Sequence, residues 1–298
     1  MTGLIDRGYE IENWPTYNPN ENGIHPDVFK YCLLNRTRYL KLPNDSLRSK
    51  PEIWTRQFAE LNNLERLNYS DIFHVHYGSN FNLLETLFRY FPNKFIVVSF
   101  HGHDASRYFK KNGDNCYKYL FERADFITTP SFTMKNELIN RGCRPDKVQV
   151  HRYGVDLKKF NPDSKIHNIS HIRLLTVARL VEKKGIEYSL KAVATLDNIE
   201  KIKYRIIGEG PLKEYLQNVA KNLGIENCVK FIGGKTKNEV IKEMSIADIF
   251  LLNSVTAKDG DMEGVPVSLI EAQAMGLPVV SSYHAGIPEL VIDGETGF

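Results

Sequence analysis

The chain has 298 residues, a formal net charge of +3 and an apolar fraction of 42%. Its length exceeds that of one typical domain core, so we expect two domains. The small net charge gives no indication of nucleic-acid binding, and no stretch approaches the 18 apolar residues of a membrane-spanning helix. Because the sequence also shows no signal peptide, we expect a cytoplasmic protein.

The segment 29–50, "FKYCLLNRTRYLKLPNDSLRSK", is strongly basic, with six Lys or Arg residues against one Asp. A solvated surface explains such a composition. A surface for anionic lipid or for a phosphorylated acceptor explains it as well. The second interpretation allows a peripheral contact with the inner face of the cytoplasmic membrane.

Short β-rich segments alternate with helical stretches along the chain. The predicted strands are residues 71–76, 94–100, 125–130, 147–153, 172–178, 203–208, 228–233, 248–254 and 278–282. The predicted helices are residues 52–67, 80–91, 114–124, 131–141, 186–196, 211–223, 236–246 and 265–276. This alternation predicts βαβ units and parallel sheets. The strands are apolar almost throughout, which predicts that both faces of each sheet are covered.

The alternation pauses at residues 154–172, a polar segment that contains Pro162 and has no periodicity. We interpret it as the linker between two domains, residues 1–160 and residues 161–298. The predicted fold class is α/β, with two Rossmann-like, doubly wound parallel-sheet domains that face a cleft. Ligands of such folds bind at the carboxyl ends of the strands, so we expect the site in the cleft.

Both ends of the sequence are typical of a fragment. The first residues read as the end of a helix that enters a strand, and the last six, "DGETGF", stop in a turn. We therefore expect the first strand of the first domain and the C-terminal helices of the second domain to lie outside this chain.

The segment "MEGVPVSLIEAQAMGLPVVSS" (262–282) carries Glu263 and Glu271 in apolar surroundings. Pro266 suits the first turn of a helix, whose free N–H groups favour phosphate. Eight helical residues rise about 12 Å, so the carboxylates should lie about 10 Å apart. Glycosidase carboxyl pairs lie closer, at about 5–9.5 Å. The spacing instead favours a nucleotide-sugar, which is anionic in the middle and carries hydroxyls at both ends.

Two cations follow the predicted strand 172–178. Arg179 and Lys184 in "VARLVEKKGIEY" would neutralise a diphosphate and stabilise it as a leaving group, although a charged loop is the simpler interpretation. Glycines in neighbouring turns would let the backbone approach a ligand; these are Gly208, Gly210 and Gly233. The third glycine of a dinucleotide fingerprint is absent, so a nicotinamide cofactor is only weakly indicated.

Histidines and aspartates offer two candidate metal sites. His101 and His103 follow the strand 94–100, and two more histidines end the strand 71–76. A single hydrogen-bonding histidine in the cleft is the preferred interpretation. The pair Asp259 and Asp261 resembles a metal-binding DxD, but cations and a helix N-terminus already neutralise the expected charge. We interpret both as turn residues and predict no metal.

Four strings in the second half resemble the retaining glycosyltransferases of family 4, which have the GT-B fold. They are "VARLVEKKG", "IGEGPL", "FIGG" and "DMEGVPVSLIEAQAMGLPVVSSYHAGIPELVIDGETGF". The last string contains the family's E-x7-E motif at Glu263 and Glu271. The resemblance covers about residues 70–298 and is strongest to bacterial exopolysaccharide enzymes of the colanic-acid type. "HRYGVD" (151–156) differs from the family's usual "PNGVD", with no assigned consequence.

The resemblance implies a role for each matching residue. Glu263 would bind donor sugar hydroxyls, Glu271 would bind the ribose, and His101 would contact the sugar near the reacting carbon. Arg179 and Lys184 would hold the diphosphate with backbone N–H groups around Val265–Val267. The predicted catalytic residues are His101, Glu263, Arg179 and Lys184. The predicted donor-binding residues are Arg179, Lys184, Gly208, Gly210, Gly233, Glu263, Gly264, Val265, Pro266, Val267 and Glu271.

The predicted function is retaining transfer of a hexose from a nucleoside-diphosphate-sugar to a hydroxyl acceptor, in bacterial exopolysaccharide or other cell-surface glycan synthesis. The acceptor would be a glycan or a lipid-linked sugar. Neither a cofactor nor nucleic acid is expected. Two alternatives stay open, namely a sugar-nucleotide 2-epimerase of the same architecture and a nucleotide-binding but inactive fragment.

Overall fold

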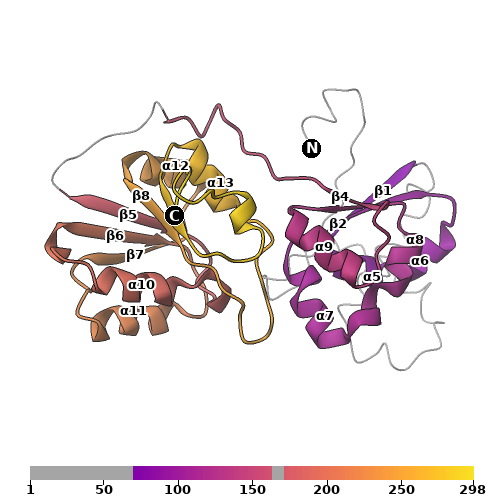
Figure 1. Cartoon of the computed structure of the whole chain (residues 1–298), viewed down its shortest axis with the longest axis horizontal. Coiled ribbons are helices and arrows are strands. Elements are labelled where there is room, and N and C mark those ends of the chain that lie inside the picture. The colour runs from indigo at the N-terminus through magenta and orange to yellow at the C-terminus, as the bar shows by residue number, and fades with distance from the viewer. Residues whose placement is uncertain (1–69, 163–170) are drawn as a thin grey trace, which may run out of the picture. The chain divides into compact units, whose positions relative to one another are not determined.

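The computed structural model describes residues 70–162 and 171–298, which form two parallel sheets with helices (Figure 1). The basic segment 29–50 and the predicted helix 52–67 lie outside the described residues. Residues His74–Ser79 and Ile96–Phe298 form one compact unit. This unit contains every predicted site residue, while the domain boundary at 160/161 stays a prediction.

The first sheet has the strand order β1-β2-β3-β4. Its strands are β1 (Ile72–His76), β2 (Phe95–Ser99), β3 (Phe126–Thr129) and β4 (Val148–Val150). β3 pairs in parallel with both β2 and β4. All four strands confirm segments predicted from the sequence.

The second sheet has the order β7-β6-β5-β8-β9 and is parallel throughout. Its strands are β5 (Ile172–Val177), β6 (Ile202–Ile207), β7 (Val229–Gly233), β8 (Ile249–Leu252) and β9 (Val279–Ser281). The strand order reverses direction between β5 and β8. Doubly wound sheets bind ligands at such a switch point, outside the carboxyl ends of the strands.

Five described helices accompany the first sheet. They are α5 (Gly78–Leu83), α6 (Glu85–Tyr90), α7 (Arg107–Asn112), α8 (Lys118–Arg123) and α9 (Phe132–Asn140). The helix predicted at 80–91 is therefore two short helices. The helix predicted at 114–124 begins as a 3-10 turn, Asp114–Tyr117, and α7 was not predicted.

Helices cover both faces of the second sheet (Figure 1). α10 (Ile186–Ala194) and α11 (Lys213–Asn222) lie on one side. α12 (Lys237–Ile246) and α13 (Val267–Ala274) lie on the other. Each side has its own apolar core, with Leu190 and Leu216 in one and Met244 and Leu269 in the other. Burying such a side chain fully contributes about 1.5–3 kcal/mol, so the helix layers on both faces stabilise the sheet.

None of the described helices is both long enough and apolar enough to cross a membrane.

Candidate active site

The N-terminus of α13 faces the loop that carries Glu263. Pro266 occupies the N-cap position with φ −67° and ψ 117°, and no side chain caps the first turn or adds an acidic charge to it. The helix begins at Val267, two residues after the predicted start at residue 265. Its free N–H groups and its dipole suit an anion.

Glu263 and Lys184 form a buried ion pair. The Lys184 Nζ lies 2.8 Å from Oε1 of Glu263, and the two side chains are 13% and 7% exposed. Oε1 makes no aligned hydrogen bond to any other described group. Lys184 ends the 3-10 turn Glu182–Lys184 after β5, and Glu263 lies in the segment after β8. The pair therefore links the segments that follow the two strands of the switch point.

Burial and the Glu263 carboxylate shift the pKa of Lys184 in opposite directions. Burial lowers the pKa of its ammonium group, and the Glu263 carboxylate opposes that shift. The neighbouring charges of Lys183 and Arg179 lower the pKa further. Arg179 is exposed in the same loop, so Arg179, Lys184 and Glu263 lie within electrostatic range of one another.

His101 leaves the end of β2 and has both ring nitrogens engaged. Its Nε2 lies 3.0 Å from Nδ1 of His76, and its Nδ1 lies 2.6 Å from the hydroxyl of Tyr153. Burial lowers the pKa of His101 to about 4, partly opposed by Asp104. The ring is therefore neutral at neutral pH and acts as a hydrogen-bonding group. A substrate reaching either nitrogen must displace a partner.

Asp104 fixes the backbone around His101. Its fully buried carboxylate accepts the N–H groups of His101 and Gly102 at Oδ1, at 3.0 and 2.8 Å. Its Oδ2 accepts the N–H of Gly78 at 2.9 Å. Three backbone hydrogen bonds to one carboxylate compensate its burial without a cation.

Two glycines bring the His101 backbone against the Glu263 loop. A Cβ on Gly264 would lie 2.3 Å from the carbonyl oxygen of His101, and one on Gly102 would lie 3.1 Å from the nitrogen of Gly264. The N–H of Met262 also donates to Ser106 Oγ at 3.2 Å. Within the compact unit the structure thus brings His101, Glu263 and Lys184 together.

Other predicted site residues are engaged elsewhere. Glu271 pairs with Lys237 at 3.1 Å. A Cβ on Gly208, where φ is +141°, would lie 1.8 Å from the carbonyl oxygen of Ala178, and one on Gly210 would lie 2.4 Å from that of Leu180. The glycines are needed for packing between two loops. Their contact with a donor stays a prediction, as do the ribose contact of Glu271 and the role of Gly233.

The Asp259–Asp261 pair forms a turn. Oδ1 of Asp259 accepts the N–H of Asp261 at 2.9 Å, as an aspartate does when it closes a turn on its own backbone. Asp259 also pairs with Arg107 at 3.1 Å, and Asp261 with Lys183 at 3.0 Å. Across residues 70–162 and 171–298, no three His, Cys, Asp or Glu side chains are arranged to hold a metal ion.

Three residues of this region were missed by the sequence reasoning. Tyr153 holds the His101 ring, and its position in "HRYGVD" was the available signal. Lys183 is adjacent to Lys184 in the sequence, but it pairs with Asp261 instead of Glu263. His284 has a buried Nε2 without a hydrogen bond to the described residues. Burial lowers its pKa, which Glu263 opposes, so His284 lies near Glu263.

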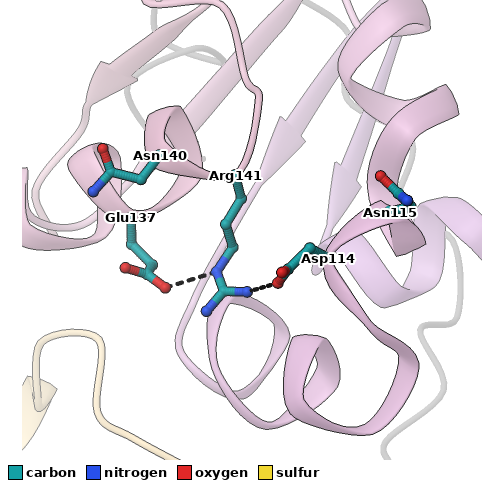
Figure 2. Close-up of a pocket in the computed structure, with 5 residues that line it drawn as sticks. All are labelled: Asp114, Asn115, Glu137, Asn140 and Arg141. Carbon is teal, nitrogen blue, oxygen red and sulfur yellow. Dashed lines mark hydrogen bonds and ion pairs between the residues drawn. The ribbon is translucent and has the colours of Figure 1, made fainter.

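A separate pocket lies between the 3-10 turn Asp114–Tyr117 and α9, and no predicted site residue lines it. It is lined by Asp114, Asn115, Glu137, Asn140 and Arg141. The guanidinium of Arg141 points between two carboxylates (Figure 2); it donates to Glu137 at 2.7 Å and also pairs with Asp114. The charges of this pocket are paired with one another, so we assign it no function.

Two parallel sheets with helices, the second of them doubly wound, are the architecture of the GT-B glycosyltransferases. Two family models match the chain. "Glycosyltransferase Family 4" covers residues 2–159, and "Glycosyl transferases group 1" covers residues 159–298. The chain therefore belongs to the glycosyltransferases of family 4.

Curated relatives match along the whole chain. The amylovoran biosynthesis glycosyltransferase AmsK of Erwinia amylovora is 40% identical over 100% of this chain and 81% of its own length. The putative colanic acid biosynthesis glycosyltransferase WcaL of Escherichia coli K12 is 32% identical with the same coverage.

Solved structures confirm the GT-B fold. Anabaena HepE in complex with UDP-glucose has a TM-score of 0.66 at 19% identity, covering 80% of this chain and 67% of that one. Sucrose-phosphate synthase from Thermosynechococcus elongatus has a TM-score of 0.68 at 18% identity, covering 86% and 66%.

Proposed function

We propose that this protein transfers a hexose from a nucleoside-diphosphate-sugar to a hydroxyl acceptor with retention of the anomeric configuration. The buried pair of Lys184 and Glu263, 2.8 Å apart, is the observation that carries this proposal. A cation for a leaving diphosphate and a carboxylate for sugar hydroxyls must lie side by side if one ligand is to meet both.

The surroundings of the pair fit the proposed ligand. The uncapped N-terminus of α13 offers N–H groups to the diphosphate, and Arg179 adds a planar guanidinium. Glu263 accepts hydrogen bonds from the sugar. The His101 segment lies against the Glu263 loop, and so close to the expected position of the reacting carbon.

The reaction breaks the bond between the anomeric carbon and the diphosphate oxygen and forms one to the acceptor oxygen. The acceptor's proton goes to the departing diphosphate, so atoms and charges balance. Arg179 and Lys184 stabilise the negative charge that develops on the leaving group. The neutral ring of His101 supplies a hydrogen-bonding group near the positive charge that develops on the sugar. We assign no carboxylate as nucleophile and favour attack from the face that the diphosphate leaves.

The biological role follows from the relatives. AmsK and WcaL are named for amylovoran and colanic acid biosynthesis, so we propose exopolysaccharide synthesis for this chain. The acceptor would be a glycan or a lipid-linked sugar at the inner face of the cytoplasmic membrane. No metal is needed in this proposal, because the side chains and the α13 N-terminus neutralise the diphosphate.

A panel of nucleoside diphosphates in a thermal-shift assay identifies the donor base, since ligand binding raises the melting temperature. Transfer is then measured with the matching sugar donors, with EDTA present, and NMR of the product reads the anomer. Glu263→Ala and Lys184→Ala should each lose about two decades or more of kcat, since removing one electrostatic group costs about 2.7–4 kcal/mol. The control is Lys191→Ala, which removes an exposed ion pair with Glu187.

Full transfer by either site variant would refute the assignment, and so would an inverted product. Incubation with donor alone separates transfer from 2-epimerisation, because an epimerase converts the donor without an acceptor.

A further inference from the structure

Lys183 and Lys184 are consecutive in the chain but meet different partners. Lys184 binds the carboxylate of Glu263. The Lys183 Nζ donates to Oδ1 of Asp261 at 3.0 Å and to the carbonyl oxygen of Met262 at 3.3 Å. The two lysines of one 3-10 turn thus bind two successive parts of the loop that presents Glu263.

The main chain strengthens the same connection. The N–H of Val255 donates to the carbonyl oxygen of Lys183 at 2.9 Å, and the N–H of Lys258 donates to Glu182 at 3.2 Å. Within the loop, the N–H of Ala257 donates to the carbonyl of Asp261 at 2.9 Å. The turn therefore holds the loop before and after residues 257–261.

Lys183 is not placed as a ligand for the diphosphate. It is 8% exposed, and its ammonium already satisfies a carboxylate and a backbone carbonyl. An ammonium group has three donors, and two are directed at the residues immediately before Glu263. Moving it toward a ligand would leave the Asp261 carboxylate, 18% exposed, without its cation.

We propose that Lys183 is a positioning residue that fixes Glu263 by holding Asp261 and the Met262 carbonyl. This inference rests on the proposed function for its effect on transfer, but not for its effect on the loop. Lys183 sets where the carboxylate lies, and Lys184 supplies the charge beside it.

The test replaces Lys183 by Met, which keeps most of the length of the side chain and removes its donors, and by Arg, which keeps the charge. Lys191→Met is the matched control, because Lys191 pairs with Glu187 on the exposed surface of α10. Kinetics are measured at a temperature where circular dichroism shows every variant folded. Hydrogen exchange of residues 257–264 is followed by mass spectrometry.

Lys183→Met should lower kcat by roughly 10- to 100-fold, as expected for a misplaced group, while affinity for the nucleoside diphosphate changes by less than about threefold. Exchange of residues 257–264 should rise in this variant and stay unchanged in the Lys191→Met control. Lys183→Arg should recover most of kcat. If Lys183→Met does not fold, the double variant Lys183→Met/Asp261→Asn replaces it, because it leaves no unpaired carboxylate.

Unchanged exchange of residues 257–264 overturns the inference, and so does unchanged kcat. A large loss of nucleoside diphosphate affinity also overturns it, because it makes Lys183 a ligand of the diphosphate. If the wild-type protein transfers no sugar but Lys183→Met still loosens the loop, the proposed function fails while the positioning of the loop stands.

Discussion

Replacing Lys184 by Met should lower both the stability and the activity of this protein. The substitution leaves the Glu263 carboxylate, with its side chain 7% exposed, without a cation. At the observed 2.8 Å and an effective dielectric constant of about 20, the lost attraction is about 6 kcal/mol. Relaxation and water entry reduce this value, and breaking one side of a buried pair typically costs about 3–5 kcal/mol.

The double variant Lys184→Met/Glu263→Leu removes both charges. A buried ion pair replaced by apolar side chains is often neutral or stabilising, so this variant should regain most of the lost free energy of unfolding. It should nevertheless stay inactive, since both groups that would meet the donor are gone. Urea unfolding followed by far-UV circular dichroism measures the stability, and release of nucleoside diphosphate measures the transfer.

A Lys184→Met variant as stable as the wild type would show that the pair does not form in solution. An active double variant would show that neither charge takes part in the reaction. Either result would refute the reasoning, the first at the level of the structure and the second at the level of the chemistry.

Three further predictions concern the frame around the site. Asp104→Asn should lower the free energy of unfolding by about 1–3 kcal/mol, because the NH2 group of the new side chain would face a backbone N–H donor that loses its acceptor. Denaturant unfolding measures this change. Gly208→Ala should lower the free energy of unfolding far more than Gly224→Ala in the same assay. A Cβ at residue 208 would lie 1.8 Å from a carbonyl oxygen, whereas a Cβ at residue 224, where φ is +70°, would meet open space. The His101 ring should stay neutral down to about pH 5 in NMR titration, because burial lowers its pKa to about 4. Since the unfolded chain takes up that proton first, His101 alone should lower the free energy of unfolding by at most about 1.4 kcal/mol per pH unit as the pH drops from about 6.5 to about 4. His74, whose pKa burial also lowers to about 4, should add to this decrease. A ring that titrates near 6.5 would contradict this.

The sheets were predictable because each strand is a short apolar run between turn signals, and burial on both faces demands that pattern. The start of α13 was predictable to within two residues for a local reason, since a proline favours the start of a helix and Pro266 is its N-cap residue. The short helix α7 was missed because its six residues, "RYFKKN", span less than two turns. Periodicity needs a longer stretch to be visible.

The candidate site was only partly predictable. Lys184 and the His101 backbone do lie near Glu263 or its loop, but the partner of each residue depends on contacts between distant parts of the chain. Nothing in "EKKG" distinguishes the lysine that binds Glu263 from the one that binds Asp261. Likewise, the sequence did not reveal that a Cβ at residue 208 would lie 1.8 Å from the carbonyl oxygen of Ala178; the contact of Gly208 with a ligand stays a prediction.

In the ion pair of Lys184 and Glu263, each side chain neutralises the charge of the other. A ligand that captures only the lysine, such as bare phosphate, leaves a buried carboxylate uncompensated, and this penalty opposes its binding. A sugar without a phosphate must compete with the ammonium for the same carboxylate. A molecule that carries both an anionic group and hydroxyls offers a partner to the ammonium and to the carboxylate at once. If the proposed function is correct, we expect the pair to favour binding of the intact donor over binding of either of its fragments.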